Sequence, residues 1–563
     1  MLISKMKINI GQIACVAAAI FALTACGESE PQTSGAPPDM RRLTSEQYRN
    51  VIHDVFGEHV EIASRFDPLV RTDGLFAVGA SNALITPSGF EKFYNIARSV
   101  ARQAVDKDNR AVLIPCAPAD ALRANEACSR QFFTEVGRHL YRRPLTESEM
   151  ETAVSAANEV ADQLNDFYSG IEFGLTGLLV TPSFLFIIDE TEPDSSSLSG
   201  LRLTGHAKAS RLSFLLWNSA PDDMLLEAAE SGALHTDNGI ERQVERMVRS
   251  PFLARGVRAF FEDFLDLEKF ENLEKDTTIY PAYTINTAES AKEQMLRTIV
   301  DHTVNQDAPY PEIFTTRKTF IDSHLGRVYR VPVARPDGGW EPYEFPEDDV
   351  RAGILTQMGF LSLFSHPGRS SATLRGKAVR ELLLCQKVPD PPGDIDFSLF
   401  NDPNAPSRTA RDRLTAHATV PSCAGCHKLT DPIGLGFEQF DGIGQFRVAE
   451  QGAIIDVAGD LDGNQFADAK SLAQAMHDSP SVPACLTNQL YSYAAGRAPE
   501  RDEREFVRYL EDGFSDSGYS LKSLLRDIAT SDAFYAVSEP KRVDDGVVRA
   551  ASFNDKTKQE LGS

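Results

Sequence analysis

The chain has 563 residues and a formal net charge of −24 at pH 7, and 42% of its residues are hydrophobic. This hydrophobic content is typical of globular domains and excludes a chain that is disordered throughout, while the length predicts about four domains. The negative charge excludes nucleic acid as an expected partner and argues against anionic lipid head groups, because both would be repelled.

The N-terminus has the pattern of an export signal. Two lysines precede an apolar run over residues 8–21, which is too short to span a bilayer stably. The run ends in Leu-Thr-Ala before Cys26, similar to a bacterial lipobox, in which the cysteine thiol carries diacylglycerol after cleavage. We therefore predict a lipoprotein signal peptide at residues 1–25, lipidation of Cys26 and a polar tether at residues 26–40. An ordinary secretory signal with an incidental cysteine is the alternative.

Both signals direct the chain out of the cytoplasm. An aspartate directly after the lipidated cysteine would favour retention in the inner membrane, but Gly27 stands at that position. We therefore expect the protein to be anchored on the periplasmic side of a Gram-negative outer membrane. No later segment is predicted to span a bilayer, and membrane attachment is therefore expected through the lipid anchor alone.

The body of the chain is predicted to be mainly α-helical. Thr44 with Gln47, and Thr146 with Glu149, have the spacing of capping boxes at helix N-termini. Thr204 opens a third run with apolar residues at helical spacing. These openings predict consecutive helical modules.

Two further patterns bear on the fold. The aromatic residues of segment 241–270 have helical spacing, and core packing explains them better than a cofactor site. Strand signals are sparse, and the best of them lie at residues 327–331 and 453–457.

A covalent haem attachment motif stands in the C-terminal part of the chain. Cys423-Ala-Gly-Cys426-His427 places two thiols where they can add to the two vinyl groups of haem, with the histidine as proximal iron ligand. A thioredoxin-like redox site would need a surrounding βαβ pattern, which is absent. A zinc site would need further ligands at finger-like spacing, which His417 does not supply. We therefore predict one covalent haem c.

The residues after the motif suggest how the haem would be held. The Pro432 carbonyl is predicted to accept the Nδ1 proton of His427 and so orient the ring. Gly434 and Gly436 would let the backbone pass close to a flat macrocycle. Arg447 would pair with a propionate, or else be an ordinary surface arginine.

The sequence does not identify the sixth iron ligand. Met476 follows the motif at a sequence separation typical of a distal methionine, and His417, which precedes the motif, is the alternative. A methionine or second histidine would make a low-spin electron carrier, whereas an open position would permit chemistry on peroxide or a substrate.

An even number of cysteines remains when the signal and the motif are set aside. Cys116, Cys128, Cys385 and Cys485 allow three pairings if they form two disulfides, as the compartment favours. The pairing of near neighbours joins Cys116 to Cys128 and leaves Cys385 to Cys485, on either side of the haem motif. Four buried free thiols are the alternative.

These motifs together resemble the large secreted c-type cytochromes first noted in planctomycetes, in which consecutive domains of unknown function accompany one haem domain. The resemblance rests on Arg42-Leu-Thr, Tyr141-Arg-Arg-Pro-Leu-Thr, Ala209-Ser-Arg-Leu-Ser-Phe-Leu-Leu-Trp, Thr373-Leu-Arg-Gly-Lys with the haem motif, and Leu490-Tyr-Ser-Tyr-Ala-Ala-Gly-Arg. It implies a mainly α, multidomain fold with a cytochrome c-like domain near the C-terminus. The expected modules are 41–110, 128–190, 200–330, 350–450 (haem domain) and 460–537, followed by a tail at 538–563.

The favoured function is electron transfer by an exported, lipid-anchored monohaem cytochrome with a redox partner protein in the cell envelope. A carrier needs only about 100 residues, so the helical modules would serve as docking surface. One alternative is a haem-dependent oxidoreductase or peroxidase with an open sixth iron position. Another is an envelope binding or assembly protein whose haem is structural. No dinucleotide-binding fingerprint and no nucleophile elbow supports other chemistry.

Overall fold

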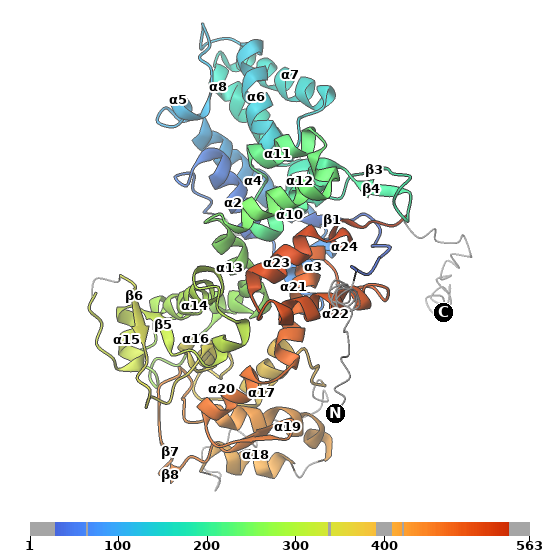
Figure 1. Cartoon of the computed structure of the whole chain (residues 1–563). Coiled ribbons are helices and arrows are strands. Elements are labelled where there is room, and N and C mark those ends of the chain that lie inside the picture. Colours follow the sequence, from blue (N-terminus) through green and yellow to red (C-terminus); the bar gives the residue numbers. More distant parts are fainter. Residues whose placement is uncertain (1–28, 64–65, 336–338, 390–407, 419–420, 540–563) are drawn as a thin grey trace, which may run out of the picture.

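The computed structural model describes residues 29–63, 66–335, 339–389, 408–418 and 421–539, with the side chains of residues 416–418 and 421–423 excepted. The chain is mainly α-helical and multidomain, as predicted (Figure 1). In these ranges we find no helix with the length and hydropathy needed to cross a membrane.

The N-terminal modules form the upper part of the molecule in Figure 1. Their elements are β1 (Met40–Arg42), α2 (Ser45–Phe56), α3 (Phe76–Gly79), η1 (Ala80–Asn82), α4 (Pro87–Ala104), α5 (Arg110–Leu113), α6 (Glu126–Tyr141), α7 (Glu147–Leu164), α8 (Phe167–Leu179), α9 (Pro182–Leu185) and β2 (Phe186–Ile188).

A third module leads from this upper part to the lower part. Its elements are β3 (Thr191–Pro193), β4 (Leu201–Leu203), α10 (Gly205–Leu216), α11 (Asp223–Glu230), η2 (Ala233–His235), α12 (Asp237–Val248), α13 (Leu253–Phe264), η3 (Leu267–Asn272), α14 (Ile285–Val300), η4 (Asp301–Asn305), η5 (Tyr310–Phe314), β5 (Lys318–Ile321), α15 (Ser323–Tyr329) and β6 (Glu341–Glu344).

The segment with the predicted haem motif extends to the bottom of Figure 1, and the C-terminal module, whose first helix lies beside it there, returns to the middle of the molecule beside β1 and α3. The elements of the first are η6 (Ile354–Thr356), α16 (Met358–Leu363), α17 (Ala372–Ala378), η7 (Val379–Leu383), α18 (Ala410–Ala418), α19 (Pro421–Gly434), η9 (Leu435–Phe437), β7 (Ala449–Glu450) and β8 (Ala453–Ile454). Those of the second are β9 (Gly459–Leu461), β10 (Asn464–Phe466), α20 (Ala469–His477), α21 (Ser481–Ala495), α22 (Arg504–Asp516), α23 (Leu521–Thr530) and α24 (Asp532–Tyr535).

Two large hydrophobic cores hold the modules together. One extends from Leu43 to Phe214 and joins the two N-terminal modules. The other extends from Leu75 to Val537 and unites the third module with the motif segment and the C-terminal helices. The modules therefore share cores, and none of these helices buries its apolar face in isolation.

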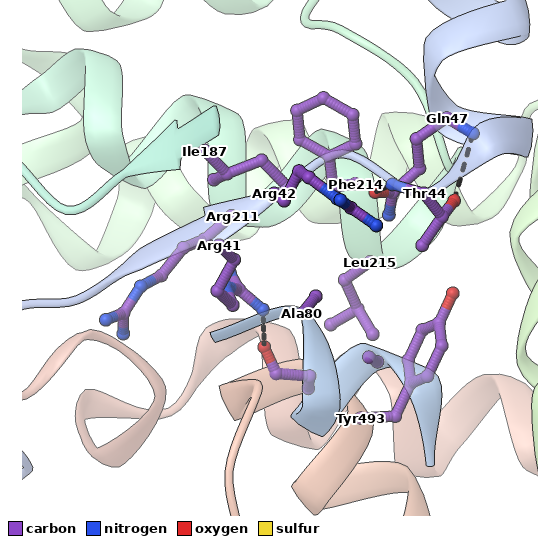
Figure 2. A pocket seen from close by; sticks show the side chains of 12 residues that line it. Arg41, Arg42, Thr44, Gln47, Ala80, Ile187, Arg211, Phe214, Leu215 and Tyr493 are labelled. Carbon is purple, nitrogen blue, oxygen red and sulfur yellow. Dashed lines mark hydrogen bonds between the residues drawn. The ribbon is translucent and has the colours of Figure 1, made fainter. Parts of the chain in front are cut away.

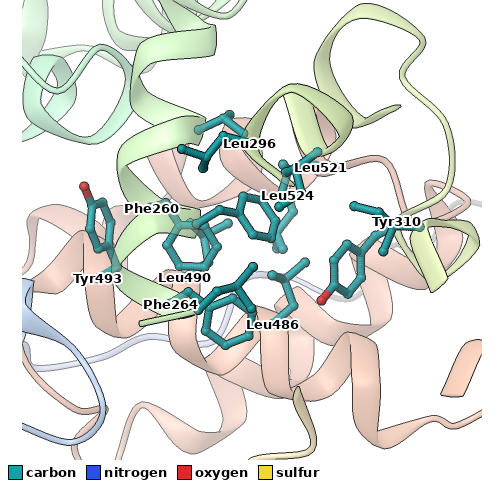
Figure 3. Packing of buried hydrophobic residues seen from close by; sticks show 14 of the residues in the cluster. Phe260, Phe264, Leu296, Tyr310, Leu486, Leu490, Tyr493, Leu521 and Leu524 are labelled. Atoms are coloured by element: carbon teal, nitrogen blue, oxygen red, sulfur yellow. The ribbon is translucent and has the colours of Figure 1, made fainter. Parts of the chain in front are cut away.

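The aromatic segment within residues 241–270 packs in the larger core, as predicted. Phe260 and Phe264 of α13 lie among leucines of α21 and α23 (Figure 3). The ring centroids of Phe260 and Tyr493 are 5.3 Å apart in an edge-to-face arrangement, and those of Phe260 and Phe264 are 5.4 Å apart. Each such buried aromatic ring contributes about 2 kcal/mol of hydrophobic stabilisation, so this contact anchors the C-terminal helices to the third module.

Strands are short and form antiparallel pairs. In the described residues β1 pairs with β2, β3 with β4, β5 with β6, β7 with β8, and β9 with β10. The first pair joins distant parts of the chain, because Arg41 lies opposite Ile187 and Arg42 opposite Phe186. β8 coincides with the start of the strand predicted at residues 453–457.

Local helix signals are confirmed, but one strand prediction is wrong. Thr44 and Thr146 cap α2 and α7 in reciprocal capping boxes, and Thr204 caps α10. Residues 327–331, predicted as a strand, instead contain the end of α15. Asp322 caps that helix, and its apolar positions point into the core.

The described part of the predicted tether is packed rather than free. The Glu30 carboxylate accepts a hydrogen bond from the Ala533 amide, and Ser34 donates to Asp502. Ala36 forms a β-bridge with Val537. Polar composition predicted a linker here, but these partners lie 468 to 503 residues away in the sequence and leave no local signal.

Candidate functional site

The predicted haem-attachment motif lies on a single helix. α19 starts at Pro421, and its backbone includes positions 423, 426 and 427. Helical spacings of three and four residues place these positions on one face of α19, as attachment to a single macrocycle requires. The side chains of Cys423 and His417 lie outside the described residues, as does Cys26.

Cys426 has the properties that thioether formation needs. It is the free cysteine of the described residues and is partly exposed. Its thiol donates a hydrogen bond to the Pro389 carbonyl at 3.0 Å. A methyl group placed on the neighbouring Gly425 would meet no atom of the described residues within 4 Å.

His427 is held by a carboxylate and not by the predicted proline carbonyl. Its Nδ1 atom lies 2.7 Å from Asp431 Oδ2, one helical turn along α19, and its side chain is 18% exposed. Asp431 is buried and also accepts a hydrogen bond from Thr373 on α17 at 2.8 Å. An ionised carboxylate accepts, so Nδ1 donates the proton of this hydrogen bond, and Nε2 is the ring nitrogen that would ligate a metal.

The Pro432 prediction is thus corrected, and helix geometry gives the reason. Pro432 lies inside α19, five positions after His427, whereas Asp431 lies four positions after it on the same face. The glycines that follow serve the packing of protein against protein. A methyl group on Gly434 would lie 1.7 Å from the Ala372 carbonyl, and one on Gly436 would lie 2.9 Å from the Phe466 ring.

α17 packs tightly against α19 and fixes its position. Gly376 is required at the crossing, because a methyl group there would lie 1.9 Å from the Thr430 carbonyl. Arg375, beside it, is fully buried. Its guanidinium donates at 2.5–3.3 Å to the carbonyl oxygens of Leu361, Phe437, Phe440 and Asp441. Burial lowers the pKa of Arg375 to about 10, which leaves it charged at neutral pH.

A buried carboxylate accompanies this arginine. Glu438 is 1% exposed and lies 4.0 Å from the Arg375 guanidinium. Burial raises the pKa of Glu438, opposed by Arg375, Ser370 and Arg447. Arg447, predicted to bind a propionate, donates to Glu438 at 3.1 Å and to Ser370 at 2.9 Å. Sequence patterns did not reveal Glu438, because its partners come from separate segments.

The predicted distal methionine is enclosed by protein. Met476 on α20 is 0% exposed and belongs to the larger core. A bond from its thioether to iron would require this part of the core to open. The adjacent His477 hydrogen-bonds Asp478 at 2.7 Å.

Both predicted disulfides are present. Cys116 bonds to Cys128 and Cys385 bonds to Cys485. The second bridge joins the segment before the motif to α21 behind it. The alternative of four free thiols is therefore wrong.

Two sizeable hollows lie away from the motif. One, of about 390 Å³, is lined by residues such as Glu30, Arg202 and Asp532. The other, of about 700 Å³, is lined by residues such as Gln489 and Arg508. Neither is lined by residues of α17 or α19.

Comparisons with known families match most of the chain. Five models, each described as a protein of unknown function, match in consecutive order: DUF1587 at residues 41–106, DUF1595 at 128–189, DUF1592 at 203–331, DUF1588 at 351–450 and DUF1585 at 462–534. No curated protein and no solved structure matches the chain. The chain thus contains the consecutive domains of unknown function that its resemblance to the planctomycete-type cytochromes implies, and it fits that family in this respect.

Proposed function

We propose that this protein is an exported, lipid-anchored cytochrome that carries one covalent haem c and transfers electrons. The observation that carries the proposal is the placement of the attachment motif on one face of α19, with a free Cys426 thiol and with His427 held at Nδ1. In this proposal Cys423 and Cys426 form the thioethers and His427 is the proximal ligand.

The residues around the motif fit such a group. Asp431 holds the Nδ1 proton, fixes the tautomer and makes the imidazole a stronger electron donor. Thr373 on α17 donates a hydrogen bond to the Asp431 carboxylate, so α17 orients the His427 ring through Asp431. Bound haem would supply a one-electron iron couple.

Electron transfer is favoured over catalysis because the attachment motif predicts an iron couple, while no sequence fingerprint of a second cofactor accompanies it. Of the hollows among the described residues, the two named above are lined by other modules, and a substrate bound in either would have no contact with α19. A haem-dependent oxidoreductase or peroxidase is the second candidate, and the burial of Met476 favours it because that residue is not poised as a sixth ligand.

The compartment and partner form part of the proposal. Two disulfides support an oxidising environment, as the periplasm provides. Lipidation of Cys26 would hold the protein at the outer membrane, and its partner there would be another redox protein of the envelope.

The attachment is tested by spectroscopy of the protein matured with haem. We expect a c-type absorption spectrum and haem that stays bound after denaturation in acidified acetone. The variant Cys423→Ser/Cys426→Ser should lose this covalent retention, whereas Cys116→Ser/Cys128→Ser should keep it. Covalent haem in the first variant would refute the attachment site.

The same sample separates the two candidate functions. A reduced spectrum that carbon monoxide does not change would indicate a filled sixth position and support electron transfer. A shift on adding carbon monoxide would indicate an accessible iron and favour the oxidoreductase.

Asp431→Asn tests the role of the carboxylate. We expect haem attachment to persist and the reduction potential to rise on the order of 50 mV, since about 59 mV corresponds to a tenfold change for one electron. The reason is that a neutral amide withdraws the anionic support of the ferric state. Potentiometric titration measures the shift, and Asp516→Asn, at an exposed position on α22, is the control. Equal potentials in both variants would contradict the role assigned to Asp431.

A further inference from the structure

A small hollow lies where three modules meet. It is bordered by β1 and the start of α2, by α10, and by α21 of the C-terminal module (Figure 2). Its volume is about 30 Å³, which is room for one or two waters or one monatomic ion. A nucleotide, a sugar or a phosphate group with its substituents is too large.

Arginines dominate the wall of this hollow. It is lined by Arg41, Arg42 and Arg211, and its lining contains no aspartate or glutamate. Arg211 points away from the middle in Figure 2 and forms a buried ion pair with Asp189 at 2.6 Å. Its charge is therefore already neutralised.

The other two arginines have no such partner. Arg42 is 4% exposed, and among the described residues it donates only to backbone carbonyls, those of Asp67 at 2.9 Å and Pro68 at 3.2 Å. Its Nε atom is buried and has no hydrogen-bond acceptor among the described residues. Figure 2 shows its side chain extending into the middle of the group, between Arg41 and Thr44.

Arg41 adds a second positive charge. Its guanidinium donates to the Ala494 carbonyl at 3.3 Å. Asp189 and Asp39 act on it only from a distance, as Asp67 does on Arg42. In the described part of the chain no carboxylate lies within ion-pair distance of Arg41 or Arg42. Two cations thus border one hollow whose lining contains no carboxylate, and neither has an ion-pair partner among the described residues.

Two cations at one hollow, with no ion-pair partner in the described part of the chain, lower the stability of the fold unless an anion is bound between them. Burying a charge without a partner is strongly unfavourable, and a water molecule would satisfy the Arg42 Nε–H but not the charge. We propose that this hollow binds one monovalent anion of chloride size between Arg41 and Arg42. The bound ion would neutralise the two arginines of β1 beside α21, whose Tyr493 and Ala494 also line the hollow. This proposal does not depend on haem.

The test is the effect of chloride on unfolding at constant ionic strength. We expect the unfolding midpoint to rise saturably, on the order of 2 °C, when sodium gluconate is replaced by sodium chloride. Arg42→Met should abolish this dependence, and Arg504→Met, at an exposed position on α22, should retain it. Equal midpoints of the wild-type protein in both salts would overturn the proposal.

A second measurement covers the case in which Arg42→Met does not fold. Crystals of the wild-type protein grown in sodium bromide should show an anomalous scattering peak within hydrogen-bonding distance of Arg42 Nε. A feature at that position without anomalous signal would identify a water molecule and would also overturn the proposal.

Discussion

Replacing Arg375 with methionine is expected to cost about 4 kcal/mol or more in the free energy of unfolding. The side chain is fully buried, and its loss would remove a donor from the carbonyl oxygens of four residues, of which Phe437 and Asp441 also accept a backbone amide. Methionine fills a similar volume, so the loss would report the missing hydrogen bonds and charge rather than a cavity. Urea denaturation of the protein without haem measures the effect independently of the proposed function.

The matched control is Arg508→Met on α22. That arginine is 68% exposed, forms a weak surface pair with Glu505 at 4.0 Å and donates a long hydrogen bond to the Arg504 carbonyl at 3.4 Å. Its replacement should change the free energy of unfolding by less than about 0.5 kcal/mol. Similar losses in the two variants would show that the buried network contributes no more than a surface arginine.

The Arg375 variant should also become pH-dependent through Glu438. Burial already raises the pKa of this carboxyl, and removal of Arg375 takes away a charge that opposes the rise. A carboxyl whose pKa is higher in the folded than in the unfolded state destabilises the fold as the pH increases through that interval. The loss in the free energy of unfolding caused by Arg375→Met should therefore be smaller near pH 5 than near pH 8. The double variant Arg375→Met/Glu438→Gln should show the same loss at both pH values.

Sequence reasoning succeeded where the signal was local. The capping boxes of Thr44 and Thr146 depend on residues three positions apart and formed as predicted. It failed at residues 327–331, where β-branched and aromatic residues suggested a strand. There the Asp322 cap and the burial of Leu325 and Val328 outweigh that propensity.

The surroundings of the motif were only partly predictable. Asp431 follows His427 by four positions, and the recognition that this segment is helical would have identified the contact. The Arg375 network offered no such signal, because its carbonyl partners come from residues 361 and 437–441. Their meeting depends on how α16, α17 and η9 pack, which single-sequence periodicity does not determine.

The second large effect is expected from the disulfide between Cys385 and Cys485. It closes a separation of 100 residues that includes α18, α19 and the haem motif. In the chain-entropy model a loop of this length contributes about 4.7 kcal/mol, against about 3 kcal/mol for a loop near 15 residues. We therefore expect Cys385→Ala/Cys485→Ala to lose about 4 kcal/mol, with weakened attachment of α21 to the motif segment.

The chain supplies its own control in the short disulfide. Cys116 and Cys128 are separated by 12 residues and lie in the other hydrophobic core. Because the two cores can unfold in separate transitions, calorimetry of each double-alanine variant should show which transition moves. We expect the long-loop variant to lower the transition of the core that contains α21 and leave the other unchanged. A larger effect from the short disulfide would mean that native packing, rather than restriction of the unfolded chain, sets the stabilisation.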